Sequence, residues 1–167
     1  MLRRIPVKVL LVVGASFGTA LALTVIAQAG DRDKEHGRSI RGAGTTMVEG
    51  GTGAPSFDPL LTKVAFHWEG GSGQFECLAL APGAKAGSKG SGSFNTNVMY
   101  VTGAITSAEL QGRTAVLKGS ATVTGVGAGS NRPFTATVRR GGPGATLVLE
   151  VSGLTFKEIL LEGEFGL

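Results

Sequence analysis

Residues 114–126 read TAVLKGSATVTGV, and this stretch decides the fold class. One face of it carries the apolar side chains of Ala115, Leu117, Ala121 and Val123. The other face is mostly polar, with Lys118, Ser120, Thr122 and Thr124 beside Val116. An alternation of two residues is typical of a β-strand that has one buried face and one solvated face. The stretch therefore predicts an antiparallel strand that covers a hydrophobic core.

The same alternation recurs from Met47 to the end of the chain, between turn clusters rich in Gly, Ser, Asn and Pro. No capped segment with a helical period follows residue 29. We therefore expect an all-β fold, an antiparallel β-sandwich or small β-barrel of about seven to nine short strands after an N-terminal signal helix. In this glycine-rich chain Gly103, Gly119 and Gly125 fall inside expected strands. They indicate bulges or bends, which favour the curvature of a barrel.

A hairpin is expected near the start of this domain. Val64, Phe66 and Trp68 share one face of its first strand. Residues 74–81 return as its second strand after the glycine turn at 70–73, because glycine enters the left-handed backbone region freely.

The last segment of the chain also alternates. Its core face is expected to hold Ile159, Leu161 and Phe165. The opposite, solvated face is expected to hold Glu158, Leu160, Glu162 and Glu164. Residues 155–161 are the one place where a helical turn competes with a strand, and the stretches 82–92 and 127–132 are expected loops.

The N-terminus has the three parts of a secretory signal peptide. Arg3, Arg4 and Lys8 precede an apolar run from residue 9 to residue 27, and Ala27-Gln28-Ala29 offers small residues for cleavage. We therefore assign residues 1–29 to a signal peptide and expect a secreted, extracytoplasmic protein. The alternative is an uncleaved membrane anchor, since the run is just long enough to span a bilayer. After cleavage no stable membrane span is expected.

The charge of the whole chain is misleading about its partners. The sequence has 16 Lys and Arg against 12 Asp and Glu, a formal net charge of +4. Removing residues 1–29 takes away three basic residues, and residues 30–45 hold four basic and three acidic ones. We expect this stretch to be a flexible charged leader. The single all-β domain, 46–167, then has nine charges of each sign, so it lacks the basic excess that nucleic-acid binding requires.

Cys77 is the only cysteine of the chain, so no internal disulfide can form. It alternates with Phe75 and Ala79 on an apolar strand face. This position predicts a buried free thiol. The alternatives are a disulfide to another chain or a reactive thiol, and the latter needs a nearby base.

The densest group of chemically capable side chains is His67, Trp68, Glu76 and Cys77. His67 could serve as a base for Cys77 across the hairpin, and the group could hold a zinc ion. However, neighbours in a strand point to opposite faces, and no metal-binding spacing is present. A core Trp68 with a solvent-facing His67 is therefore the favoured interpretation, and we expect no catalytic residue, metal or cofactor.

Other catalytic patterns are missing from the sequence. It has no G-x-S-x-G elbow, HExxH motif, P-loop or dinucleotide-binding fingerprint. The carboxylates of Glu158, Glu162 and Glu164 could form an acidic pair for glycoside hydrolysis, but a charged, solvated strand face explains them more simply.

Residues from about 98 to 165 contain short sequence motifs that are typical of one family of bacterial proteins. They are YVTGAIT from Tyr100, TAVLKG from Thr114, ATVTGVG from Ala121, PFTATV from Pro133, and GPGA before the aliphatic strand at Leu147. This half of the mature chain resembles the small secreted bacterial β-domains of the post-COAP-1 type. The sequence departs from their pattern at residues 139–142, where RRGG replaces an acidic turn, and in the hairpin around His67. The resemblance implies an accessory, non-catalytic surface domain and carries over no functional residue.

We therefore expect a secreted or surface β-domain that is a non-catalytic interaction or structural module. Its partner would be an unidentified extracellular protein or glycan. One alternative is a binder of a small apolar ligand inside a barrel cavity. Another is a hydrolase that uses the region of His67 and Glu76, which requires these side chains to converge in a concave site.

Overall fold

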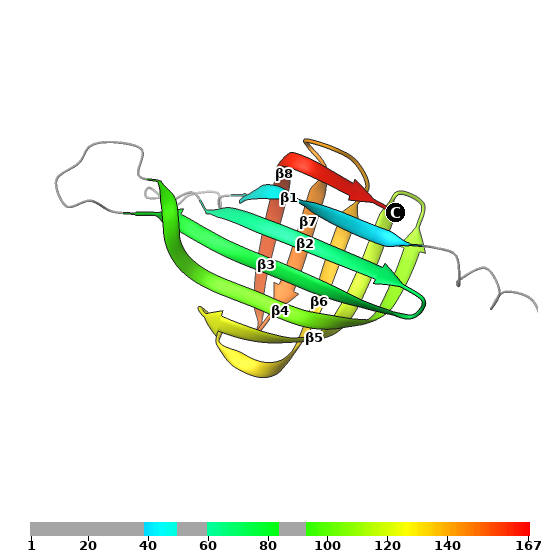
Figure 1. The fold of residues 1–167 in the computed structure, drawn as a ribbon, viewed down its shortest axis with the longest axis horizontal. Coiled ribbons are helices and arrows are strands. Elements are labelled where there is room, and N and C mark those ends of the chain that lie inside the picture. The colour runs from blue at the N-terminus through cyan, green and yellow to red at the C-terminus, as the bar shows by residue number, and fades with distance from the viewer. Residues whose placement is uncertain (1–38, 50–59, 84–92) are drawn as a thin grey trace, which may run out of the picture.

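The computed structural model describes residues 39–49, 60–83 and 93–167. Eight antiparallel strands close into a barrel in which each strand lies beside its neighbours in the sequence and β8 lies beside β1 (Figure 1). The strands are β1 (Ile40–Val48), β2 (Leu61–Glu69), β3 (Ser72–Pro82), β4 (Phe94–Gln111), β5 (Thr114–Gly125), β6 (Gly129–Arg139), β7 (Thr146–Val151) and β8 (Leu154–Gly166). The all-β prediction is confirmed, and of its two architectures the barrel is the one formed. The expected signal helix lies outside the described residues.

Two strands begin earlier than expected. β1 starts at Ile40, inside the stretch assigned to the charged leader, and fully buried Ile40 pairs with Trp68. β6 starts at Gly129, inside the stretch expected to be a loop, where Gly129 pairs with Val123. In both places main-chain pairing with a neighbouring strand forms a ladder that needs no alternation of side chains. Within the described residues no helix is long and apolar enough to cross a membrane.

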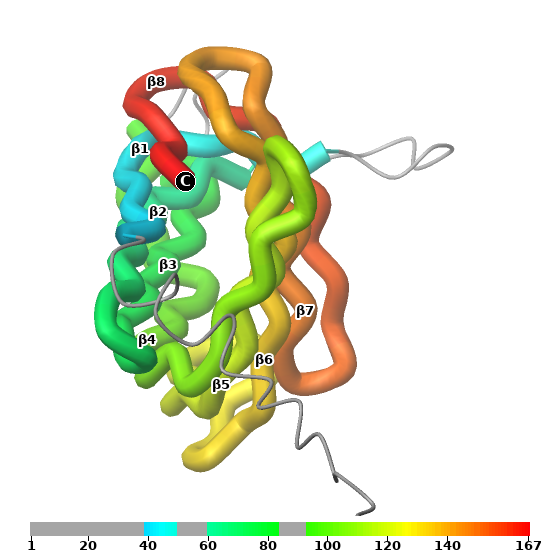
Figure 2. Tube along the Cα trace, turned by 90° about the vertical axis from the view of Figure 1, so that its right-hand side faces the viewer, coloured from blue at the N-terminus to red at the C-terminus, as the bar shows by residue number. Residues whose placement is uncertain are grey.

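The barrel interior is filled by side chains. Strands β1 to β4 lie along one wall and β6 and β7 along the wall opposite (Figure 2). Inside, the ring centroids of Phe75 and Phe134 lie 5.1 Å apart, and those of Phe66 and Phe165 lie 5.4 Å apart. The Phe75–Phe134 contact joins β3 to β6 across the barrel, whereas Phe66 and Phe165 lie on the two strands that flank β1. An eight-stranded barrel is just wide enough for side chains to fill. The predicted inward face of β2 is confirmed, since Val64, Phe66 and Trp68 are all buried.

The predicted faces of the last strand are wrong over part of its length. Glu158 and Leu160 are 2% and 1% exposed, although both were expected on the solvated face. Leu161 is 44% exposed, although it was expected in the core. Phe165 is fully buried, as expected. The region forms a strand and not a helical turn.

A β-bulge explains this inversion. Thr46 pairs with Leu160 and Thr45 pairs with Glu162, so Leu161 is an extra residue with no partner on β1. One extra residue exchanges the two faces of a strand, because side chains alternate with a period of two. Strict alternation therefore predicts the correct faces for residues 162–165, after the bulge, and inverted faces for residues 158–161.

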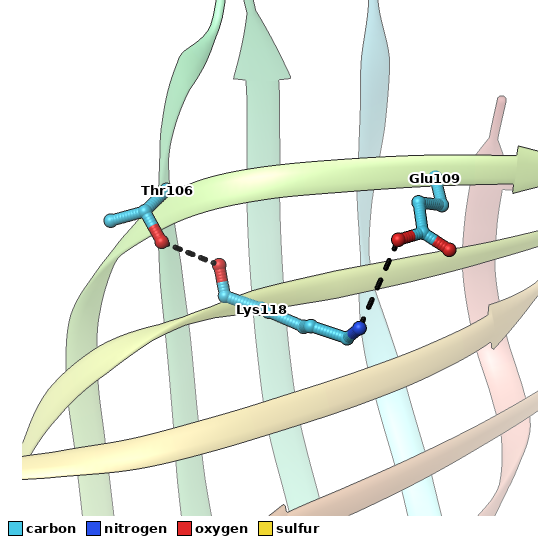
Figure 3. Close-up of polar contacts among 3 residues, drawn as sticks. All are labelled: Thr106, Glu109 and Lys118. Atoms are coloured by element: carbon cyan, nitrogen blue, oxygen red, sulfur yellow. Dashed lines mark hydrogen bonds and ion pairs between the residues drawn. The ribbon is translucent and has the colours of Figure 1, made fainter.

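A second bulge bends β4 against β5. Ile105 pairs with Gly119 and Ser107 pairs with Lys118, which leaves Thr106 as the extra residue. The Thr106 hydroxyl donates a hydrogen bond of 3.3 Å to the Lys118 carbonyl, and Lys118 Nζ lies 3.8 Å from Glu109 Oε1 (Figure 3). The register shift lies opposite Gly119, with the extra residue on β4, whereas Gly103 pairs in regular register and Gly125 ends β5.

Candidate functional site

An open groove lies on the outer wall of the barrel, where β8, β1, β2 and β3 run side by side. Its volume is about 990 Å³. It lies toward the end of the barrel at which β1 begins and β8 ends (Figure 1). The polar side chains that line it belong to Ser39, Arg41, His67, Gln74, Glu76, Arg140 and Glu164.

Strand register arranges these side chains in two rows across the wall. In the outer row, nearest the barrel end, Arg41 pairs with His67 and His67 pairs with Gln74. In the inner row Glu164 pairs with Ala43, Ala43 with Ala65, and Ala65 with Glu76. The rows lie two residues apart along each strand, which is about 6.6 Å. The methyl groups of Ala43 and Ala65 leave the floor of the groove low between longer neighbours.

The groove carries charges of both signs. Arg41, Glu76, Arg140 and Glu164 are all exposed. Arg140 comes from the connection between β6 and β7, which is held against β8 because Gly141 N donates to Phe165 O at 3.1 Å and Phe165 N donates to Gly141 O at 2.9 Å. Among the described residues, the one ion pair within 4 Å is that of Lys118 and Glu109. The four groove charges are therefore available to a ligand.

The structure divides the four candidate residues between the two sides of the wall. His67 and Glu76 are exposed and line the groove. Trp68 and Cys77 are buried in the barrel interior, and Cys77 is a free thiol, as expected. His67 therefore cannot act as a base for Cys77, because the strand wall separates the two side chains.

His67 and Glu76 are diagonal neighbours on β2 and β3. Ser39 supplies a hydroxyl to the same groove. Within residues 39–49, 60–83 and 93–167, no hydrogen bond joins His67 to either of these side chains. In the same part of the chain no group of three His, Cys, Asp or Glu residues could hold a metal ion.

A second polar cluster lies inside the barrel. The hydroxyls of Thr46 and Thr62 both donate to Glu158 Oε2, the second at 2.5 Å, and they also contact each other. Glu158 Oε1 is buried without a hydrogen-bond partner among the described residues. Burial raises the pKa of Glu158, and the hydrogen bonds from Thr46 and Thr62 act in the opposite direction. The cluster therefore favours a neutral carboxyl group.

The Cys77 thiol lies close to this cluster, which changes the pKa of the thiol. Burial raises the pKa of the Cys77 thiol well above its ordinary value, the negative charge of Glu158 raises it further, and a hydrogen bond with Thr62 lowers it. A thiol of this kind stays protonated and is a poor nucleophile.

Five polar residues of the groove and the interior site of Glu158 are not found from the sequence. Ser39 and Arg41 fall in the expected leader, Gln74 and Arg140 carry no motif, and Glu164 stands out only as part of an acidic pair. Alternation could have placed Gln74 outward beside His67. It could not have shown that β1 and β8 complete the groove, because their pairing joins opposite ends of the chain.

Comparison of the chain with protein-family models, curated proteins and solved structures finds no match. The resemblance to post-COAP-1 domains therefore stays a prediction. The geometry of the groove and of the barrel interior is the basis for a functional proposal.

Proposed function

We propose that this chain is an extracytoplasmic, non-catalytic binding module whose outer groove holds an extended peptide segment of a partner protein. One observation carries the proposal: an open groove of about 990 Å³ presents two arginines and two glutamates that form no ion pair with another described residue. The aromatic rings packed inside the barrel favour this groove over an apolar ligand site in the interior.

The two rows of charge match the repeat of an extended peptide. Arg41 lies in the outer row, with Arg140 at its end, and Glu76 and Glu164 lie in the inner row, about 6.6 Å away. Side chains two positions apart in an extended peptide face the same side and are separated by the same distance. A peptide that runs along the strands would therefore present an acidic residue to the outer row and a basic residue, two positions away, to the inner row.

A glycan is a less suitable occupant. Sugar rings commonly pack on exposed aromatic faces, whereas Phe66 lines the groove with only 4% of its surface exposed. The floor of Ala43 and Ala65 offers a small apolar surface, which suits the backbone of a peptide.

Fluorescence anisotropy with capped synthetic peptides tests this function. One peptide carries Asp and Lys two positions apart, and a second has the same composition with Asp and Lys adjacent. We expect the first to bind the purified protein more tightly. Arg140→Glu should weaken its binding about fivefold, since one exposed ion pair contributes at most about 1 kcal/mol.

Arg139→Glu is the matched control, because it makes the same charge change one residue away and Arg139 does not line the groove. It should change the affinity by less than about twofold. Equal effects of the two substitutions, or equal binding of the two peptides, would contradict the proposal. Binding of uncharged oligosaccharides without any preference between the peptides would assign the groove to glycans.

One observation favours a hydrolase as the second candidate: His67 and Glu76 line the same concave site. A nucleophile would have to come from the Ser39 hydroxyl, since Cys77 lies on the other side of the wall. Ester hydrolysis by the purified protein would favour this activity over simple binding if His67→Ala abolishes it. The control Gln111→Ala, which lies outside the groove, should keep it.

A further inference from the structure

Four arginines gather at one end of the barrel. They are Arg41, Arg113, Arg139 and Arg140, and all are exposed. This is the end at which β1 begins, β8 ends, and the β4–β5 and β6–β7 connections lie, marked by the C-terminus in Figure 1. We call these four residues the arginine rim.

Hydrogen bonds and strand pairing hold three of the rim residues in one continuous arc. Arg140 N donates to Arg113 O at 2.8 Å, and Arg113 Nη2 donates to Arg140 O at 3.4 Å. The next residue, Gly141, bridges to Phe165 on β8. Gly166 then pairs with Arg41 on β1. The arc therefore runs from the β4–β5 turn across β8 to the start of β1.

Acidic side chains at this end lie beside the arc of arginines. Among the described residues, Glu164 and Glu76 lie in the inner row of the groove, and Glu69 lies at the β2–β3 turn. Glu109 is already paired with Lys118. Folding thus brings four arginines from separate parts of the sequence together at one end of the barrel.

We infer that the arginine rim docks the barrel end-on onto an anionic lipid surface. Guanidinium groups recognise phosphate oxygens through paired hydrogen bonds, and clustered basic residues bind to negatively charged leaflets. The chain enters the barrel at Ile40, beside the rim. The preceding part of the sequence contains the uncharged apolar run of residues 9–27. Insertion of that run into a bilayer, as an anchor or during export, would tether the barrel close to the lipid headgroups.

Co-sedimentation of the full chain with lipid vesicles tests the inference. Vesicles of phosphatidylcholine alone measure the contribution of the apolar run, and vesicles with about one third phosphatidylglycerol add the negative charge. We expect tighter binding to the second set and a loss of the difference at high salt. The double variant Arg113→Glu with Arg139→Glu should lower binding to the anionic vesicles by about tenfold or more and leave binding to neutral vesicles unchanged.

The matched control reverses two exposed basic residues near the opposite end, Arg132→Glu with Lys157→Glu. It should reduce anionic binding far less than the rim variant. Equal losses in the two double variants, or no preference for anionic vesicles, would overturn the inference. So would binding to soluble polyphosphate without binding to vesicles. If the charge reversals impair folding, judged by circular dichroism, Arg113→Gln with Arg139→Gln gives a milder version of the same comparison.

This test is independent of the peptide-binding function. Arg113 and Arg139 lie outside the groove, so the rim variant should bind the Asp/Lys peptide normally. A failure of vesicle binding with intact peptide binding would overturn the lipid inference alone.

Discussion

Glu158 lies inside the barrel with 2% of its surface exposed, between the hydroxyls of Thr46 and Thr62. A carboxylate at such a position loses its hydration, and two hydroxyl donors replace only part of it. One of its oxygens has no partner among the described residues. The folded state therefore holds a proton on Glu158 more tightly than the unfolded chain does.

This environment makes the stability of the barrel depend on pH. The pKa of Glu158 is raised in the folded state, whereas an unfolded glutamate has a pKa of about 4.3. Below the unfolded value both states are protonated, and the contribution of Glu158 to stability is fully present. As the pH rises from the unfolded pKa through the folded pKa, the unfolded chain loses the proton of Glu158 before the folded state does, so the stability of the folded state falls.

We expect Glu158→Gln to remove this decline. Urea unfolding midpoints of the wild type and the variant, measured between about pH 4 and pH 8, provide the check. Glu162→Gln, on the exposed part of the same strand, is the control and should leave the pH dependence as it is in the wild type. A wild-type curve that rises with pH, or one that Glu158→Gln does not flatten, would show that Glu158 does not control it.

Within strand β8, the bulge at Leu161 sets which residues face the core. Leu160 is 1% exposed and Leu161 is 44% exposed, although both are leucines in adjacent positions. Hydrophobic burial depends on the face and not on the residue type, so the two leucines contribute very differently to stability.

Truncation of the two leucines should separate them clearly. Leu160→Ala is expected to lower the free energy of unfolding by about 2–5 kcal/mol, because it leaves a cavity in the core. Leu161→Ala is expected to change it by about 0.5 kcal/mol or less. Chemical denaturation of both variants measures the difference. Similar losses, or a larger loss at Leu161, would mean that the bulge lies elsewhere in the strand.

Most of the strands could be predicted from local alternation, and the bulges could not. The inward face of β2 and the buried thiol of Cys77 follow directly from a period of two. Thr106 and Leu161 break that period because the partner strand, and not the local sequence, decides where one extra residue is accommodated. The start of β1 was missed for a related reason, since Ile40 is one apolar residue among charged neighbours.

At the scale of the molecule, closure of the barrel depends on β1. It pairs with β2 on one side and with β8 on the other, so residues 40–48 join the two ends of the fold. Removing these residues would leave two strand edges unpaired and would open the core to water.

We expect a variant that lacks residues 40–48 to lose cooperative unfolding. A variant that lacks only residues 30–38 should keep it, because those residues precede β1. Urea titration followed by the fluorescence of Trp68, the single tryptophan, distinguishes the two deletions. Cooperative unfolding of the first variant would show that seven strands suffice for the core and that β1 is a dispensable cover.

The candidate site was predictable only in its central strands. Alternation places His67 and Glu76 outward on neighbouring strands, and both do line the groove. Arg41, Glu164 and Arg140 reach the same groove from distant parts of the sequence. No local pattern connects them, because their proximity depends on the pairing of β1 with β8 and on the contact of Gly141 with Phe165.

The alternating sequence is sufficient to establish an all-β domain with one buried face, because that information lies between residues two positions apart. Closure into a barrel, the inverted faces of β8, the buried carboxyl of Glu158, the outer groove and the arginine rim all depend on which strands pair and in which register. Those pairings bring together residues more than a hundred positions apart, as Thr46 and Glu158 show. Hydrogen bonding between backbones is nearly independent of sequence, so the register emerges only when the whole core packs together.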